Sequence, residues 1–158
     1  MAGVGFDAHV VANVSPRLKR VVGKGAYVVE TLRQLWRFSF PRYRATVDGM
    51  VHEAASVIVA RGHFYGGRFV VAPEARLDSD ELHVCLFHRG GRLQTIYYAL
   101  ALAGGRLHRS RHVEIIKAKR VTIEGPVGDP VQGDGDLIGR LPVTIELSAT
   151  SIGLRRPI

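Results

Sequence analysis

The sequence is poor in cysteine and in long hydrophobic runs, and each shortage excludes a class of protein. Cys85 is the only cysteine among 158 residues, so no internal disulfide can form and a reducing compartment is expected. The longest uninterrupted apolar run, residues 96–103, has eight residues, far short of the roughly 18 that a membrane span requires. We therefore expect a cytoplasmic protein with no membrane-spanning segment.

Acidic residues are also scarce. The chain has 14 Asp and Glu against 22 Lys and Arg, a net charge of +8, which favours polyanionic partners such as phosphate groups, acidic lipid surfaces or nucleic acid. Residues 17–44 hold eight basic side chains and a single acid, Glu30, and residues 106–120 form a second basic stretch. No base-stacking platform or recognition motif accompanies these cations, so nucleic acid is the least favoured partner.

Hydrophobic periodicity predicts two helices in one domain that comprises residues 1–158. Ser15 is a typical N-cap and Pro16 a typical first helical residue, and apolar residues recur at helical spacing as far as Arg37. Basic residues flank this apolar arc. A second helix is predicted over residues 92–102. Its apolar face consists of Leu93, Ile96, Tyr97 and Leu100.

Short strands account for most of the remaining sequence. Asp48-Gly49 is typical of a tight hairpin turn, because both positions accept a positive φ. The predicted strands cover residues 43–47, 50–60, 69–72, 82–87, 113–123, 142–147 and 152–155. Many short strands with only two helices predict a mainly β (α+β) fold, a β-sandwich-like domain.

An acidic loop precedes the strand predicted over residues 82–87. Residues 72–81 carry four carboxylates, and magnesium prefers carboxylate and carbonyl oxygens held by an irregular backbone. The simpler interpretation is a surface turn in which Asp and Ser make local hydrogen bonds.

A second acidic segment, residues 132–139, places Asp134 and Asp136 on either side of one glycine. Glycine lets the backbone approach a ligand closely, and a carboxylate beside a substrate hydroxyl can act as its general base. The simpler interpretation is a hairpin loop.

Aromatic residues stand before the pair Gly66-Gly67, as in either an apolar contact surface or a tight strand connection. Cys85 lies in an apolar strand, and we expect it in the core.

Four segments of the chain, taken in order, carry a resemblance to one family. They are residues 2–8 (AGVGFDA), 61–67 (RGHFYGG), 72–78 (APEARLD) and 130–136 (PVQGDGD). The chain resembles, over nearly its whole length, the carboxyl-terminal domain of bacterial lipid kinases of the diacylglycerol and sphingosine kinase family. The resemblance implies a two-domain enzyme, in which an amino-terminal α/β domain binds ATP through a Gly-Gly-Asp-Gly-Thr loop and a β-sandwich domain supplies the lipid-accepting side of the cleft. No Gly-Gly-Asp-Gly occurs here, so we expect the ATP-binding domain to be absent and the chain to be inactive alone.

The resemblance also implies roles for the acidic residues. Asp136 matches the family's general base, which is a Glu, and Asp134 matches the Asp that precedes it. Because Asp is one methylene shorter than Glu, the carboxylate is displaced, and a displacement of about 1 Å can cost about two orders of magnitude in rate.

The family's magnesium loop reads Leu-Asp-Asp-Gly and matches residues 77–80 of this chain. Ser79 therefore stands where the family has a metal-binding carboxylate. The other ligands that the resemblance implies are the carbonyls of Arg76 and Glu81, and Asp78 or Asp80 would have to swing in to replace the missing carboxylate. We expect Mg²⁺ and ATP to be cofactors of the intact kinase, and their binding by this chain alone to be weak or absent.

Two further sets of residues follow from the resemblance and from the helix pattern. Gly5 and Asp7 belong at the cleft. The expected substrate or membrane contacts are Phe64, Tyr65, Gly66, Gly67, Trp36 and Phe38. A helix whose apolar arc is flanked by cations and followed by aromatic residues suits the surface of an anionic membrane; the alternative is a helix that covers the core, with Lys and Arg stems along its edges.

Together these observations predict the substrate-side domain of a diacylglycerol kinase-like lipid kinase. Its partners would be a lipid substrate, an anionic membrane surface at which it is peripheral, and a separately encoded nucleotide-binding domain. The first alternative is a catalytically dead lipid- or partner-binding module, which the departures at Ser79 and Asp136 favour. The second is a nucleic-acid binder, which rests on net charge alone.

Overall fold

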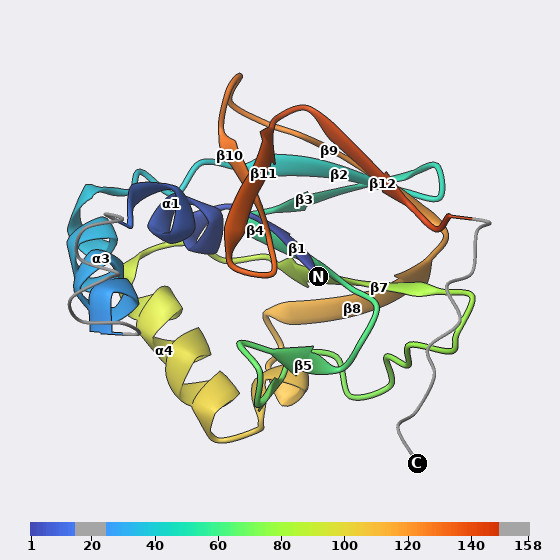
Figure 1. The fold of residues 1–158 in the computed structure, drawn as a ribbon, viewed down its shortest axis with the longest axis horizontal. Coiled ribbons are helices and arrows are strands. Elements are labelled where there is room, and N and C mark those ends of the chain that lie inside the picture. Colours follow the sequence, from blue (N-terminus) through green and yellow to red (C-terminus); the bar gives the residue numbers. More distant parts are fainter. Residues whose placement is uncertain (15–24, 149–158) are drawn as a thin grey trace, which may run out of the picture.

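Two antiparallel β-sheets pack against each other, and the helices gather on one side of the molecule (Figure 1). The computed structural model describes residues 1–14 and 25–148. In spatial order, the larger sheet consists of β11 (Asp136–Arg140), β10 (Pro130–Gly133), β1 (Ala2–Val4), β4 (Ser56–Ala60), β7 (Leu82–Phe87) and β8 (Val113–Ala118). The smaller sheet consists of β12 (Val143–Glu146), β9 (Arg120–Glu124), β2 (Tyr43–Val47) and β3 (Met50–Ala54). This arrangement confirms the mainly β, sandwich-like fold that the sequence predicts.

Several strands have the bounds that the sequence pattern predicts. β2 and β7 agree residue for residue, and β12 lies within the predicted residues 142–147. The Asp48-Gly49 turn, with φ of 44° and 90°, joins β2 to β3 as expected. The strand predicted over residues 69–72 is shorter, because β6 (Phe69–Val70) pairs only with β5 (Phe64–Tyr65). The strand predicted over residues 152–155 lies outside the described residues.

Two predicted strands are each divided between the two sheets. The segment 50–60 breaks at Ala55 into β3 and β4, and the segment 113–123 breaks at Lys119 into β8 and β9. At the second break, the Asp48 carboxylate accepts hydrogen bonds from the backbone N–H of Arg120 at 2.9 Å and of Lys119 at 3.0 Å. These bonds hold the pKa of the Asp48 carboxyl below its usual value. A turn residue therefore fixes the point at which the chain passes from one sheet to the other.

Alternate side chains from both sheets form the main core. In β2, Tyr43, Ala45 and Val47 are buried, which is the period of two typical of a strand with one face on a core. Val84 and Leu86 of β7 meet them from the larger sheet. Burial of such side chains is the principal favourable contribution to folding.

The opposite face of the larger sheet is covered as well. Cys85 and Phe87 of β7 pack with Val71, Leu107 and partly buried residues of helix α4 (Arg92–Ala103). β7 is therefore buried along its whole length. Burial raises the pKa of the Cys85 thiol to about 12, so this residue has the packing role that the sequence predicts rather than that of a nucleophile.

Three α-helices lie within the described residues, one more than predicted. The additional helix, α1 (Phe6–Asn13), has eight residues and begins after Gly5, whose φ is 105°. A Cβ at Gly5 would lie 2.4 Å from Ser56 Oγ, so both the conformation and the space require glycine there. Helix α3 (Gly25–Arg37) ends where predicted, and its predicted start at Ser15 lies outside the described residues. Helix α4 matches the prediction within one residue.

The outward side of α3 is apolar and its inward side is polar. Glu30 and Gln34 are only 7% and 8% exposed and are joined by a hydrogen bond of 2.8 Å, whereas Leu32 and Trp36 are 58% and 69% exposed. This is the reverse of a helix that covers a core. No helix in the described part of the chain combines the length and the apolar composition needed to cross a membrane.

Candidate functional site

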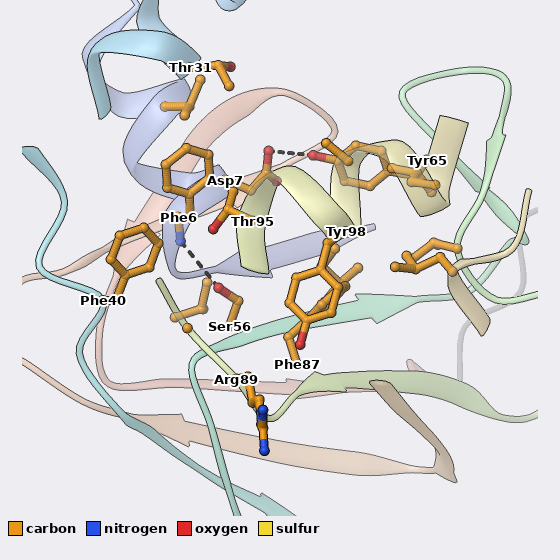
Figure 2. Close-up of a pocket in the computed structure, with 18 residues that line it drawn as sticks. Phe6, Asp7, Thr31, Phe40, Ser56, Tyr65, Phe87, Arg89, Thr95 and Tyr98 are labelled. Atoms are coloured by element: carbon orange, nitrogen blue, oxygen red, sulfur yellow. Dashed lines mark hydrogen bonds between the residues drawn. The ribbon is translucent and has the colours of Figure 1, made fainter. Parts of the chain in front are cut away.

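A mostly apolar cavity of about 230 Å³ lies between the helices and the larger sheet (Figure 2). Its apolar wall includes Val4, Phe6, Phe40, Ile58, Val71 and Phe87. The polar side chains that line it are Asp7, Thr31, Ser56, Tyr65, Arg89 and Thr95, with Tyr98 contributing its ring and hydroxyl. Figure 2 shows the Asp7 carboxylate turned toward Tyr65, while Arg89 lies away from this pair at another side of the cavity.

Among the described residues that line the cavity, Asp7 is the only one with a carboxylate. It lies in the first turn of α1, where the helix dipole favours negative charge. Its carboxylate accepts hydrogen bonds from the Tyr65 hydroxyl and from Gln132 Nε2, the latter at 2.7 Å. Burial raises the pKa of Asp7, and the two hydrogen bonds oppose that rise. Burial, with the nearby charge of Asp7, also raises the pKa of Tyr65 well above its usual value, so Tyr65 remains a donor.

Gln132 connects Asp7 to the β10–β11 turn. Its side-chain oxygen accepts a hydrogen bond of 3.0 Å from the backbone N–H of Gly135, while its amide nitrogen donates to Asp7. On the other side of the turn, the Tyr27 hydroxyl of α3 donates to the carbonyl of Gly135 at 3.2 Å. The turn is therefore held both from the cavity and from helix α3.

The predicted base lies on this turn. Asp134 has a φ of 49° and Gly135 a φ of 91°, and Asp136 is the exposed first residue of β11. The Asp134 side chain is 82% exposed and accepts a hydrogen bond of 2.8 Å from the amino group of Met1. Both carboxylates thus lie at the surface beside the turn that Gln132 ties to Asp7. Residues 132–139 thus include the hairpin turn that the simpler interpretation expects, and the predicted base lies beside that turn.

The polar groups of the acidic loop, residues 72–81, pair partly within the loop and partly with Lys117, which lies near Glu74 and Glu81. Arg76 donates to both oxygens of Asp78, with Nε and Nη2 each at 2.9 Å, and this pairing lowers the pKa of the Asp78 carboxyl. The Arg76 carbonyl accepts from the N–H of Ser79, and Ser79 Oγ accepts from the N–H of Glu81 at 3.2 Å. Within residues 1–14 and 25–148, no three His, Cys, Asp or Glu side chains are placed to hold a metal ion. Two of the groups that the resemblance assigns to the metal, the Arg76 carbonyl and the Asp78 carboxylate, are thus engaged by donors of the protein itself.

The predicted substrate contacts fall into two groups. Tyr65 lines the cavity, and Phe64 beside it is half exposed on β5. Gly66 and Gly67, with φ of 58° and 88°, form the turn between β5 and β6. Phe38, in contrast, is 8% exposed. It packs against the rings of Phe6, His9 and Phe40, because the chain turns inward directly after α3.

Helices α3 and α4 together present what we call the outer apolar face. It consists of Val28, Val29, Leu32 and Trp36 on α3 and of Leu93, Ile96, Tyr97 and Leu100 on α4, all of them exposed. The guanidinium of Arg92 joins the two helices, lying 4.6 Å from the centre of the Trp36 ring and donating to the carbonyls of Leu35 and Trp36. The acid of these two helices, Glu30, is buried, so the face is apolar and basic.

Gln132 is the residue that the sequence interpretation missed. It is separated from Asp7 by 125 positions, so no local pattern links the two. No strand was predicted over residues 130–133, so no local signal indicated that Gln132 is buried, where its amide needs partners for both of its ends.

Comparison with known proteins places these features in a family context. The model of the YegS C-terminal NAD kinase beta sandwich-like domain matches residues 1–155. A protein of Staphylococcus carnosus (strain TM300), provisionally named a lipid kinase, is 21% identical over an alignment 158 positions long. The alignment covers 97% of this chain and 51% of the relative.

Solved structures show the same fold. A diacylglycerol kinase from Bacillus anthracis str. Sterne superposes with a TM-score of 0.60 at 23% identity, over 92% of this chain and 47% of the other. A second structure from that organism, provisionally described as a diacylglycerol kinase, has a TM-score of 0.61 at 21% identity, over 92% and 48% of the two chains. The chain thus spans about half the length of the relatives it matches.

Proposed function

The chain belongs to the YegS C-terminal NAD kinase beta sandwich-like domain family, and we propose that it forms the lipid-accepting side of a kinase active site. The acceptor is a lipid hydroxyl. ATP is held by a nucleotide-binding domain, since these 158 residues contain no Gly-Gly-Asp-Gly loop. Transfer of the phosphoryl group depends mainly on positioning the two substrates, so the chain contributes the acceptor half of that positioning.

The observation that carries the proposal is an apolar cavity with a single carboxylate at one side. An apolar wall with a few fixed polar groups is typical of small-molecule sites, and 230 Å³ is somewhat below their usual range of about 300–1,000 Å³. A whole lipid does not fit such a volume. The polar end of a lipid and its first methylenes do, with a hydroxyl directed at Asp7 and the acyl chains leaving toward the helices.

The outer apolar face suits the membrane from which such a lipid would come. Apolar side chains flanked by cations bind the interface of anionic bilayers, through burial of apolar area and attraction to acidic head groups. Thr31 of α3 and Thr95 of α4 line the cavity on the inward sides of the same helices that carry this face. A lipid could therefore pass from the bilayer into the cavity between α3 and α4 without crossing water.

In the proposed reaction, the lipid hydroxyl first donates to Asp7 in the cavity and then turns toward the β10–β11 turn, where Asp136 acts as general base. Its carboxylate takes the proton from the lipid hydroxyl, the hydroxyl oxygen forms a bond to the terminal phosphorus of ATP, and the bond from that phosphorus to the bridging oxygen breaks to release ADP. Magnesium, where the intact kinase binds it, would neutralise charge on the phosphates, and the part of the reaction assigned to this chain is the proton transfer to Asp136.

Filling the cavity tests the lipid site. We expect Ala99→Phe, which places a ring at a cavity-lining position of α4, to weaken binding of dioctanoylglycerol at least about tenfold, because the ring occupies the space of the first methylenes. Binding is measured from NMR shifts of the Ile58 and Val71 methyl groups. Ala103→Phe, an exposed change on the same helix that does not line the cavity, is the matched control. Equal loss in both variants, or no lipid-dependent shift in the unaltered chain, contradicts the cavity as the lipid site.

Removing the outer apolar face tests the membrane surface. The double change Leu32→Ser and Leu93→Ser should reduce sedimentation with vesicles of phosphatidylglycerol and phosphatidylcholine by about tenfold, while Val127→Ser, at an apolar residue that is 96% exposed elsewhere, should not. Binding should also weaken as salt rises, because attraction to acidic lipid is screened. Binding that is unchanged in the double variant excludes this face.

One observation favours a second function, that of a lipid-binding module without catalysis. The Arg76 guanidinium engages both oxygens of Asp78, which leaves that carboxylate committed to an ion pair in the very loop that the family resemblance assigns to metal. Co-expression of this chain with the nucleotide-binding domain of a relative distinguishes a kinase from a lipid-binding module. Lipid phosphorylation that Asp136→Asn abolishes supports the kinase, and lipid binding with no phosphorylation in either form supports the module.

A further inference from the structure

Gln132 occupies a position from which it can link the lipid cavity to the turn that carries the proposed base. We infer that Gln132 is a positioning residue that transmits lipid binding at Asp7 to the β10–β11 turn, an inference that rests on the proposed lipid site. Its side chain is 1% exposed. Its two polar ends have two different partners, Asp7 Oδ2 at 2.7 Å and the N–H of Gly135 at 3.0 Å.

The local backbone is built to aim Gln132 in this direction. The pairing register of β10 with β11 shifts between Val131 and Gln132, and a bulge of this kind redirects the side chain that follows it. Gly3 on the neighbouring strand β1 leaves the necessary room, since a Cβ there would lie 2.7 Å from Gln132 Nε2 and 3.3 Å from Asp7 Oδ2. The Asp7–Gln132 hydrogen bond thus depends on a glycine that makes no bond itself.

The turn beyond Gln132 needs support from a side chain. Asp134 has a positive φ, which is uncommon for a residue other than glycine. Gln132 Oε1 and the Tyr27 hydroxyl hold the N–H and the carbonyl of Gly135, the residue between Asp134 and Asp136. A shift of the Gln132 amide therefore moves the segment from which the Asp136 carboxylate projects.

A lipid hydroxyl can cause such a shift. The Asp7 carboxylate has about four acceptor sites, of which the hydrogen bonds from Tyr65 and Gln132 use two, so a lipid hydroxyl can add a third donor. A hydroxyl that enters the cavity and donates to Asp7 competes for the same negative charge. The bond from Gln132 to Asp7 weakens, and the amide is free to move closer to Gly135. The base is then positioned when an acceptor is present.

Solvent exchange of the Gly135 amide proton, measured by NMR, tests this coupling. In the unaltered chain we expect saturating dioctanoylglycerol to slow that exchange by about fivefold, as one strengthened hydrogen bond would. In Gln132→Leu we expect basal exchange about fivefold faster, with no response to the lipid, because the acceptor of the Gly135 N–H is gone. A purely structural role for Gln132 predicts faster exchange in the variant but no lipid response in the unaltered chain.

A second variant avoids any change at Gln132. Gly3→Ala should push the amide away from Asp7 and abolish the lipid response at Gly135, whereas Gly139→Ala, where an added Cβ meets nothing within 4 Å, should leave it intact. Lipid-dependent shifts at Ile58 and Val71 with unchanged exchange at Gly135 would overturn the coupling and leave the lipid site standing. Absence of both signals would overturn the coupling together with the lipid site on which it rests.

Discussion

The β-sandwich and the helical layer bury their side chains in opposite ways. In the sandwich, β2 and β7 direct Tyr43, Val84 and Leu86 inward, and β2 alternates between buried and more exposed residues as a half-buried strand should. In the helical layer, α3 turns Glu30 and Gln34 inward and leaves its apolar side chains in solvent. The sandwich follows the usual segregation of polar and apolar groups, whereas helix α3 reverses it.

This reversal separates stability from binding. Apolar side chains left in water contribute nothing to folding until a partner covers them, so we expect the buried core of the sandwich to contribute more to stability than the exposed side chains of α3 and α4. The helical layer instead keeps apolar area available, together with basic side chains such as Arg92. The proposed membrane and lipid contacts all lie on this side. We therefore expect substitutions in the sandwich core to change stability and substitutions on the exposed helix faces to change binding.

The largest expected difference is between equivalent truncations in the two regions. Leu86→Ala in β7 should lower the free energy of unfolding by about 2–5 kcal/mol, since it opens a cavity in the main core. Leu93→Ala in α4, a residue that is 84% exposed, should change it by less than about 0.5 kcal/mol. Urea denaturation measures both values. Similar losses would show that the helical layer carries as much stability as the sandwich.

A smaller effect is expected at the junction of the two regions. The Tyr43 hydroxyl of β2 donates to Asp129 Oδ2 at 2.7 Å, and the same carboxylate oxygen lies 3.4 Å from His9 Nε2 of α1. Tyr43→Phe removes the donor but preserves the ring, so we expect a loss of about 1–3 kcal/mol from an acceptor left without its partner. Asp129→Asn, which keeps an acceptor, is the control and should cost less in the same urea measurement. A neutral Tyr43→Phe would mean that the junction is held by packing alone.

The comparison also explains how far the sequence could predict the structure. The sandwich strands β2 and β7 were predicted with correct bounds, because the alternation along β2 and the short apolar run of β7 are both local signals. The breaks at Ala55 and Lys119 were not, since the apolar pattern continues while the chain changes sheets. Helix α1 was missed because its eight residues show no clear apolar face.

For the candidate site, too, individual residues could be named from local motifs, but the contacts between them could not be predicted. Asp7, Asp134 and Asp136 were named from a resemblance of short motifs, and Tyr65 from its glycine-flanked segment. The link between them, through Gln132, joins residues 125 positions apart, and only the packing of α1 against β10 brings them together. The outward direction of the apolar face of α3 could not be predicted either, because periodicity defines a face without saying what it meets.

The pH dependence of stability should arise on the helical side, at Asp7. Burial holds the folded-state pKa of Asp7 above its ordinary value of 3.8, so the folded state binds this proton more tightly than the unfolded state does. The resulting stability is fully present below about pH 3.8 and is lost as pH rises to the folded pKa. Asp7→Asn cannot titrate, and we expect the stability of the unaltered chain, relative to this variant, to fall as the pH is raised from 4. Urea titrations at several pH values measure the slope. A flat difference would place the Asp7 carboxylate in a solvent-like environment.

The smallest effect should come from the surface of the sandwich. Arg120 of β9 donates through Nε to Glu146 of β12 at 2.8 Å, and both side chains are more than half exposed. Exposed ion pairs of this kind contribute about 0.2–1 kcal/mol, because water and salt screen the attraction. Arg120→Met keeps much of the aliphatic stem, and its cost in urea denaturation should fall within that range and shrink further at 0.5 M salt. A cost as large as that of Leu86→Ala would mean that charge pairing, rather than the buried core, sets the stability of the sandwich.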